Sequence, residues 1–99
     1  MPVFLHLRIK VSSENLPKLR EFLERAIPIY ERPCRLKVRL LQEHTDSTSF
    51  LELIEYETVE DFLADQKRVE EDPEQRELIR EWRQLLEQPP VVEVWHELS

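Results

Sequence analysis

The chain has 99 residues, of which 40% are hydrophobic and 35% are charged, and its formal net charge is −7. A chain of this length suits one small domain, which we place at residues 1–99. The negative charge argues against nucleic-acid binding, because phosphates would be repelled by such a surface. Glycine is absent, which excludes the glycine-rich loops that bind phosphates and dinucleotides.

The single cysteine, Cys34, allows no internal disulfide and no cysteine-rich metal site. The N-terminal segment lacks the apolar core of a signal peptide, and no apolar run approaches membrane-spanning length. We therefore expect a soluble, cytoplasmic protein that does not bind membranes.

The first half of the chain predicts a strand, a helix and a second strand. Residues 3–11 alternate between apolar and other side chains, as a strand does. Apolar residues then recur at three- and four-residue steps over residues 16–30, which indicates an amphipathic helix. Pro28 removes one backbone donor, so we expect this helix to kink or end near residues 25–27. A second strand is predicted over about residues 34–43.

The middle of the chain predicts a hairpin that leads into another helix. The loop at residues 44–47 is polar and short, which favours a hairpin. Residues 48–56 alternate and predict the third strand. Thr58 can act as the N-cap of a helix over about residues 59–70, with Glu60 and Asp61 in its first turn.

The last third predicts a second helical segment and a final strand. Asp72 and Pro73 restart the helix as N-cap and first residue, and the segment stops at Pro89 and Pro90. Residues 91–98 alternate and predict the last strand. The resulting β-α-β-β-α-β order is that of the ferredoxin-like α+β fold. Right-handed crossovers give a four-stranded antiparallel sheet with the helices on one face.

The alternation within each strand divides the predicted sheet into two faces. The face beneath the helices would carry an apolar set: Val3, Leu5, Leu7, Leu36, Val38, Leu51, Leu53, Val92 and Val94. The other face would carry a mixed set: Phe4, His6, Arg8, Arg35, Lys37, Arg39, Leu41, Phe50, Glu52, Ile54, Tyr56, Val91, Glu93 and Trp95. The mixed set is too aromatic for water and too charged for a core, so we expect a second sheet to lie against it.

Residues 54–58 and 62–66 resemble the "E-x-W-x-S/T … A-H" segment of the antibiotic biosynthesis monooxygenase domains. A likeness of pattern extends over nearly the whole chain. It implies a dimeric α+β barrel, in which the sheets of two copies face each other. Characterised members include cofactor-free quinol and polyketide monooxygenases, haem-degrading enzymes and isomerases. The haem-degrading members have an Asn near the position of His6 or Leu7, a Trp at that of Tyr56 and a His at that of Asp65, so we expect no haem degradation.

Candidate site residues lie on the predicted helix-free face. His6 would be a general base, and Tyr56 a hydrogen-bond donor to a developing oxyanion. The alternatives are a structural histidine that pairs with Glu52 or Glu93, and a tyrosine that packs at the strand–helix corner. The further candidates for ligand binding are Phe4, Arg8, Arg39, Phe50, Glu52 and Trp95.

Other features favour structural roles. We expect Trp82 in the core and an inert Cys34. The spacing of the three histidines matches no metal motif, so we predict no metal and no cofactor.

Two functions remain open from the sequence. The first is a cofactor-independent oxygenase or isomerase that acts on a small aromatic or carbonyl compound. The second is a non-catalytic homodimeric module that binds a ligand or a partner. A cavity that reaches His6 would favour the first, and an inner space filled by Phe4, Phe50 and Trp95 would favour the second.

Overall fold

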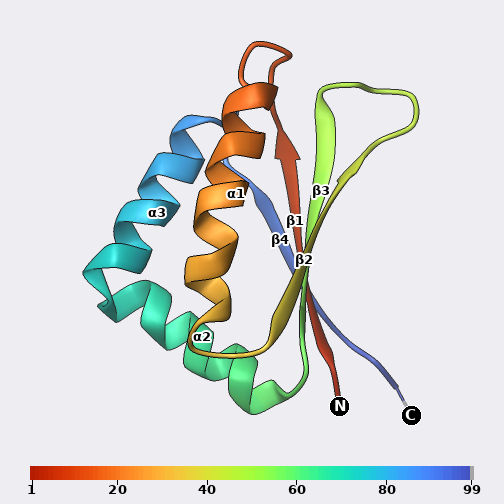
Figure 1. Ribbon diagram of the computed structural model, residues 1–99. Helices are drawn as coiled ribbons and strands as arrows, with labels where there is room; N and C mark the ends of the chain where they lie inside the picture. The colour runs from red at the N-terminus through yellow and green to blue at the C-terminus, as the bar shows by residue number, and fades with distance from the viewer. Residues whose placement is uncertain (99) are drawn as a thin grey trace.

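The computed structural model describes residues 1–98 and contains a four-stranded antiparallel sheet in the order β2-β3-β1-β4. Its elements are β1 (Val3–Lys10), α1 (Leu16–Glu31), β2 (Leu36–Gln42), β3 (Ser49–Tyr56), α2 (Val59–Glu71), α3 (Pro73–Gln84) and β4 (Val91–His96). The helices all lie on the same side of the sheet (Figure 1). The predicted ferredoxin-like fold is therefore confirmed, with the second helical region divided into α2 and α3.

Helix α1 continues past Pro28 to Glu31, so of the predicted kink or end near residues 25–27 the end was wrong. Proline leaves the carbonyl four residues earlier without its helical partner. That carbonyl belongs to Glu24, which is exposed, so water can take the place of the missing donor. The helix therefore extends far enough to place Tyr30 above the sheet.

The predicted caps of α2 and α3 are confirmed. Thr58 accepts a hydrogen bond from the backbone N–H of Asp61 at 3.0 Å. Asp72 accepts one from the backbone N–H of Glu74 at 2.9 Å, with Pro73 at the first helical position. Because Asp72 has extended backbone angles, the chain leaves α2 there and starts α3 in a new direction (Figure 1).

The β2–β3 hairpin is held by Asp46. Its carboxylate accepts hydrogen bonds from the Thr48 backbone N–H at 2.9 Å and from Lys10 Nζ at 2.7 Å. These bonds, led by the one from Lys10, lower the pKa of Asp46 well below its usual range. The same carboxylate thus ties the hairpin loop to the end of β1, which helps to set the register of β3 against β1.

That register places the two faces of β3 opposite to the prediction. Tyr56 lies across from Val3, and Ile54 lies across from Leu5, so both belong to the helix-covered face. Phe50 and Glu52 share this face and are buried. The prediction had assigned these residues to the helix-free face, with Leu51 and Leu53 under the helices, and was wrong for this strand. Both faces of β3 are rich in apolar side chains, so alternation alone did not distinguish them.

The face assignments of the other strands agree with the prediction, but β4 is not covered. Val92 and Val94 point to the helix side, yet they are 56% and 43% exposed. Most of the core lies between α1, α3, β1 and β3, and includes Ile9 and Phe22. The β4 edge therefore leaves the space beneath the helices open on one side.

None of the helices within residues 1–98 is long and apolar enough to cross a membrane.

Candidate functional site

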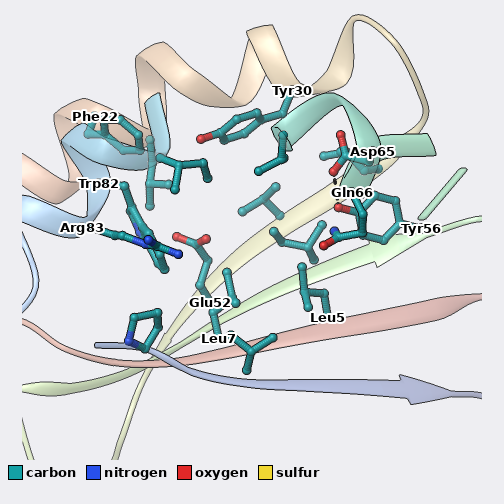
Figure 2. A pocket seen from close by; sticks show the side chains of 18 residues that line it. Leu5, Leu7, Phe22, Tyr30, Glu52, Tyr56, Asp65, Gln66, Trp82 and Arg83 are labelled. Carbon is teal, nitrogen blue, oxygen red and sulfur yellow. Dashed lines mark hydrogen bonds between the residues drawn. The ribbon is translucent and has the colours of Figure 1, made fainter. Parts of the chain in front are cut away.

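A cavity of about 180 Å³ lies between the sheet and the helices. Figure 2 shows that its side chains converge from β1 and β3 below and from the helices above. Most of its wall is apolar, and its polar lining residues are Tyr30, Glu52, Tyr56, Asp65, Gln66 and Arg83. An engineered cavity of about 150 Å³ in another protein holds benzene, so this volume suits a single aromatic ring.

Glu52 is the acidic group at the Trp82 end of this cavity. It projects from the middle of β3 towards Trp82, and its carboxyl lies between the sheet and α3 (Figure 2). Only 5% of the residue is exposed, and its Oε1 has no hydrogen-bond partner within residues 1–98. Burial raises the pKa of Glu52 to about 7. The Trp82 indole N–H lies close enough to the carboxyl to oppose part of this rise, but it does not reach hydrogen-bond geometry. A carboxyl in this state can exchange a proton at neutral pH.

Trp82 and Tyr30 face the same space from α3 and α1. The Trp82 indole is buried, and its N–H, like Glu52 Oε1, has no partner among the described residues. Burial, aided by the charge of Glu52, raises the pKa of the Tyr30 hydroxyl far above its usual value. Buried polar atoms are nearly always paired, so unpaired ones around a cavity mark a place where a ligand can supply the missing partners.

At the other end of the cavity, both carboxylate oxygens of Asp65 accept hydrogen bonds, although Nε of Arg68 has no partner within residues 1–98. The Tyr56 hydroxyl donates a hydrogen bond to Asp65 Oδ2, and Arg68 donates one to Asp65 Oδ1 at 3.3 Å. Burial and the bond to Asp65 raise the pKa of Tyr56 above its usual range. The Tyr56 ring also packs edge-on against Phe62, with ring centres 5.5 Å apart. Tyr56 is therefore committed to the strand–helix corner, which is the structural alternative considered from the sequence.

Cys34 lies next to this end of the cavity. Arg68 Nη2 is 3.4 Å from its sulfur, but burial has the larger effect and raises the pKa of the thiol. Nucleophilic cysteines need a lowered pKa. The direction of the shift therefore agrees with the expected inert thiol.

His6 and Tyr56 cannot share one space, because they lie on opposite faces of the sheet. Val3 is the β1 partner of Tyr56 and faces the helices, whereas His6 faces away from them. The predicted common site for these residues was therefore wrong. Phe50 and Glu52 do not belong to the predicted site either, since both are buried under the helices.

The remaining predicted site residues do gather on the helix-free face. The rings of His6 and Trp95 lie 6.0 Å apart, and Phe4 is the cross-strand neighbour of Trp95. Arg8 forms an ion pair with Glu93 at 3.0 Å. Arg39 is exposed on the same face. Glu52 faces the helices and His6 faces away from them, so the alternative in which these two residues pair was wrong.

The roles of Tyr30, Asp65 and Arg83 in the cavity were not predicted from the sequence. One signal was available for Asp65, which falls between Phe62 and Val69 on the apolar stripe of α2. An acid at such a position is buried only with a partner. Tyr30 ends the apolar stripe predicted over residues 16–30, which indicated burial but not a cavity. No comparable signal existed for Arg83, since its placement depends on how α3 crosses the sheet.

The described residues contain no group of three or more side chains of His, Cys, Asp or Glu that could hold a metal ion.

No family model matches the sequence, and no curated protein matches it. Among solved structures, SnoaB from Streptomyces nogalater, a cofactor-independent oxygenase, is 14% identical, with a TM-score of 0.78 over 99% of this chain and 94% of that chain. The chain has the fold of the antibiotic biosynthesis monooxygenases. A candidate member of that group from Bordetella bronchiseptica is 16% identical, with a TM-score of 0.77 over 99% of this chain and 98% of that one.

The same fold also occurs under a different family name. An uncharacterized NIPSNAP domain protein from Burkholderia xenovorans is 14% identical, with a TM-score of 0.75 over 100% of this chain and 96% of that chain. At these identities the likeness concerns the fold, so the function has to be argued from the cavity.

Proposed function

We propose that the protein is a cofactor-independent monooxygenase that acts on a small aromatic or carbonyl compound within the cavity between the sheet and the helices. Glu52 is the proton acceptor in this proposal. The Trp82 indole N–H donates a hydrogen bond to the substrate oxygen.

The observation that carries the proposal is the pair of unpartnered polar atoms, Glu52 Oε1 and Trp82 Nε1, beside an apolar cavity. A phenol or enol would satisfy both of them. Its O–H would donate to Glu52, and its oxygen would accept from the indole. A pKa of about 7 makes Glu52 a base that is partly ionised at neutral pH, as general-base catalysis requires.

The reaction class follows from this proton transfer. Glu52 removes the hydroxyl proton of a phenol, which leaves an electron-rich phenolate. The phenolate reduces dioxygen at the ring carbon para to its oxygen, and a C–O bond forms to give a hydroperoxide. Loss of that carbon's hydrogen as a proton, with cleavage of the O–O bond, releases water and leaves a quinone. One substrate and one dioxygen thus yield one quinone and one water, and the proton held by Glu52 ends in the water.

The test is dioxygen uptake in the presence of a panel of quinols and single-ring phenols. We expect turnover by the wild-type protein and a loss of about 100-fold or more in Glu52→Gln. Glu24→Gln, which changes an exposed acid on α1, is the matched control and should retain activity. Equal turnover in Glu52→Gln and wild type would overturn the role of Glu52.

The same assay tests the predicted role of His6. We expect His6→Ala to retain turnover, because His6 lies on the other face of the sheet from Glu52. Binding of these compounds without any dioxygen uptake would support the alternative of a non-catalytic ligand-binding module.

We also propose that two copies associate through their helix-free sheet faces. This face exposes 54% of Trp95, 53% of Val91 and 46% of Leu41. It carries both signs of charge, on Arg39 and Glu93 among others, so it can complement a second copy of itself. The predicted site residues Phe4, His6, Arg8, Arg39 and Trp95 would then lie at the interface.

Light scattering tests the association. We expect about twice the mass of one 12.1 kDa chain at micromolar concentration. Leu53→Glu, which places an acid in the middle of this face, should shift the mass to one chain. Leu63→Glu, which changes an exposed leucine on α2, is the control and should leave it unchanged. A wild-type protein of single-chain mass would contradict the proposal.

A further inference from the structure

A shallow groove on α3 adjoins the cavity. It is lined by Arg76, Arg80 and Arg83, together with Val69 and Ile79. Three of these residues, Val69, Ile79 and Arg83, also line the cavity. The groove therefore meets the cavity at Arg83, whose side chain is exposed and stands beside buried Trp82 (Figure 2).

Of the three arginines of this groove, Arg80 alone pairs with an acid of its own helix among residues 1–98. The acids of α3 pair as follows: Glu74 with Arg32 at 3.8 Å, Glu77 with Arg80 at 3.4 Å, and Glu81 with Arg25. Within residues 1–98, Arg76 and Arg83 form no ion pair. A local surplus of positive charge thus lies at the cavity in a chain whose net charge is −7.

We propose that the substrate is an amphipathic acid, with its hydroxyl-bearing ring in the cavity and its anionic group bound outside by Arg83 and Arg76. This inference rests on the proposed function and specifies the substrate class of the same site. A guanidinium binds a carboxylate with two parallel hydrogen bonds, which a neutral substituent cannot reproduce.

The opposite orientation, with the anionic group inside the cavity and the ring outside, is disfavoured by the residues that line the cavity. Its walls are mostly apolar, and within residues 1–98 its unpaired acidic group is Glu52, which would repel a second carboxylate when ionised. The volume of about 180 Å³ accommodates one ring but leaves no room for a long substituent. A side chain on the ring must therefore leave the cavity, and Arg83 stands where cavity and groove meet.

The experiment compares two ligands that differ only in charge: 3-(4-hydroxyphenyl)propionate and 3-(4-hydroxyphenyl)propan-1-ol. Binding is followed by NMR through the indole N–H signals of the protein's two tryptophans, Trp82 and Trp95. Trp95→Phe identifies the Trp82 signal, which reports on the cavity directly. We expect both ligands to shift this signal and the acid to bind about tenfold more tightly.

Two variants locate the preference for the acid. Arg83→Gln should weaken binding of the acid about tenfold and leave binding of the alcohol unchanged. Arg20→Gln changes an exposed arginine on α1 and is the matched control, which should keep the preference. Raising the salt concentration should weaken the acid alone.

The outcomes separate this inference from the proposed function. If both ligands shift Trp82 with equal affinity, the inference fails while the cavity remains a ligand site. A preference for the acid that survives the double variant Arg76→Gln/Arg83→Gln also overturns it. If neither ligand shifts the Trp82 signal, both the inference and the proposed function fail.

Discussion

The two ends of the cavity hold one buried carboxyl group each, and the groups differ in their partners. Asp65 accepts hydrogen bonds from Tyr56 and Arg68, so its charge is compensated within the protein. Glu52 is equally buried but leaves Oε1 without a partner among residues 1–98. A compensated carboxylate contributes to the structure, whereas an uncompensated one destabilises it. The comparison assigns structure to the Asp65 end and chemistry to the Glu52 end.

Removing the compensated acid should have the largest effect on stability. We expect Asp65→Ala to lower the free energy of unfolding by about 3 kcal/mol, because Tyr56 and Arg68 both lose their acceptor in a buried place. Urea unfolding measures the change. Glu70→Ala, on the exposed side of α2, should stay within about 0.5 kcal/mol of wild type. A loss below about 1 kcal/mol in Asp65→Ala would remove the structural role.

Replacing the uncompensated acid, Glu52, should raise the stability of the protein instead of lowering it, and the size of the gain should depend on pH. Between the unfolded-state pKa of 4.5 and the folded value of about 7, only the folded protein keeps the Glu52 proton. Stability therefore falls as pH rises through this window, by about 3 kcal/mol in total. Glu52→Gln should lack this loss, so it gains stability relative to wild type between pH 4 and pH 8.

The matched control for this pH dependence is Glu24→Gln, whose stability should equal that of wild type at pH 4 and at pH 8. Urea unfolding curves at pH 4 and pH 8 for the three proteins make the comparison. Parallel changes in wild type and Glu52→Gln would show that Glu52 titrates normally, and would weaken its assignment as proton acceptor.

The two tyrosines of the cavity also differ in their hydrogen bonding, and the expected difference in stability is smaller. Tyr56→Phe removes the donor to buried Asp65 and should cost about 1 kcal/mol of unfolding free energy. No hydrogen bond of the Tyr30 hydroxyl occurs within residues 1–98, so Tyr30→Phe should cost less than about 0.5 kcal/mol. Equal losses measured by thermal or urea unfolding would indicate that the Tyr56–Asp65 bond contributes nothing specific.

We expect no haem binding at the end of the cavity where Tyr56 and Asp65 lie. The sequence resemblance implies that Tyr56 and Asp65 replace the Trp and His of haem-degrading members, and in this structure the two residues bind each other. The cavity of about 180 Å³ is also much smaller than the pockets that hold drug-sized ligands. We expect titration with haem to give no saturable shift of the Soret band. A shift that saturates at one haem per chain would contradict this prediction.

The element order and the helix starts could be predicted from the sequence because they depend on local chemistry. Thr58 and Asp72 cap the helices that follow them through bonds to residues two or three positions later. The alternation in β1, β2 and β4 also assigned their faces, since in each strand the helix-side residues are the more apolar ones. These features require no knowledge of distant parts of the chain.

The face of β3 and the site itself were decided by tertiary structure. Both faces of β3 are apolar enough to be buried. The charged residue Glu52 favoured the prediction that its face is the helix-free one, although that face is buried. The pairing of β3 with β1, through Tyr56 opposite Val3, chose between the two faces. A shift of one residue would turn every β3 side chain to the other face. The cavity in turn needs Glu52 from β3, Tyr30 from α1 and Trp82 from α3, residues that come together only when the helices pack on the sheet.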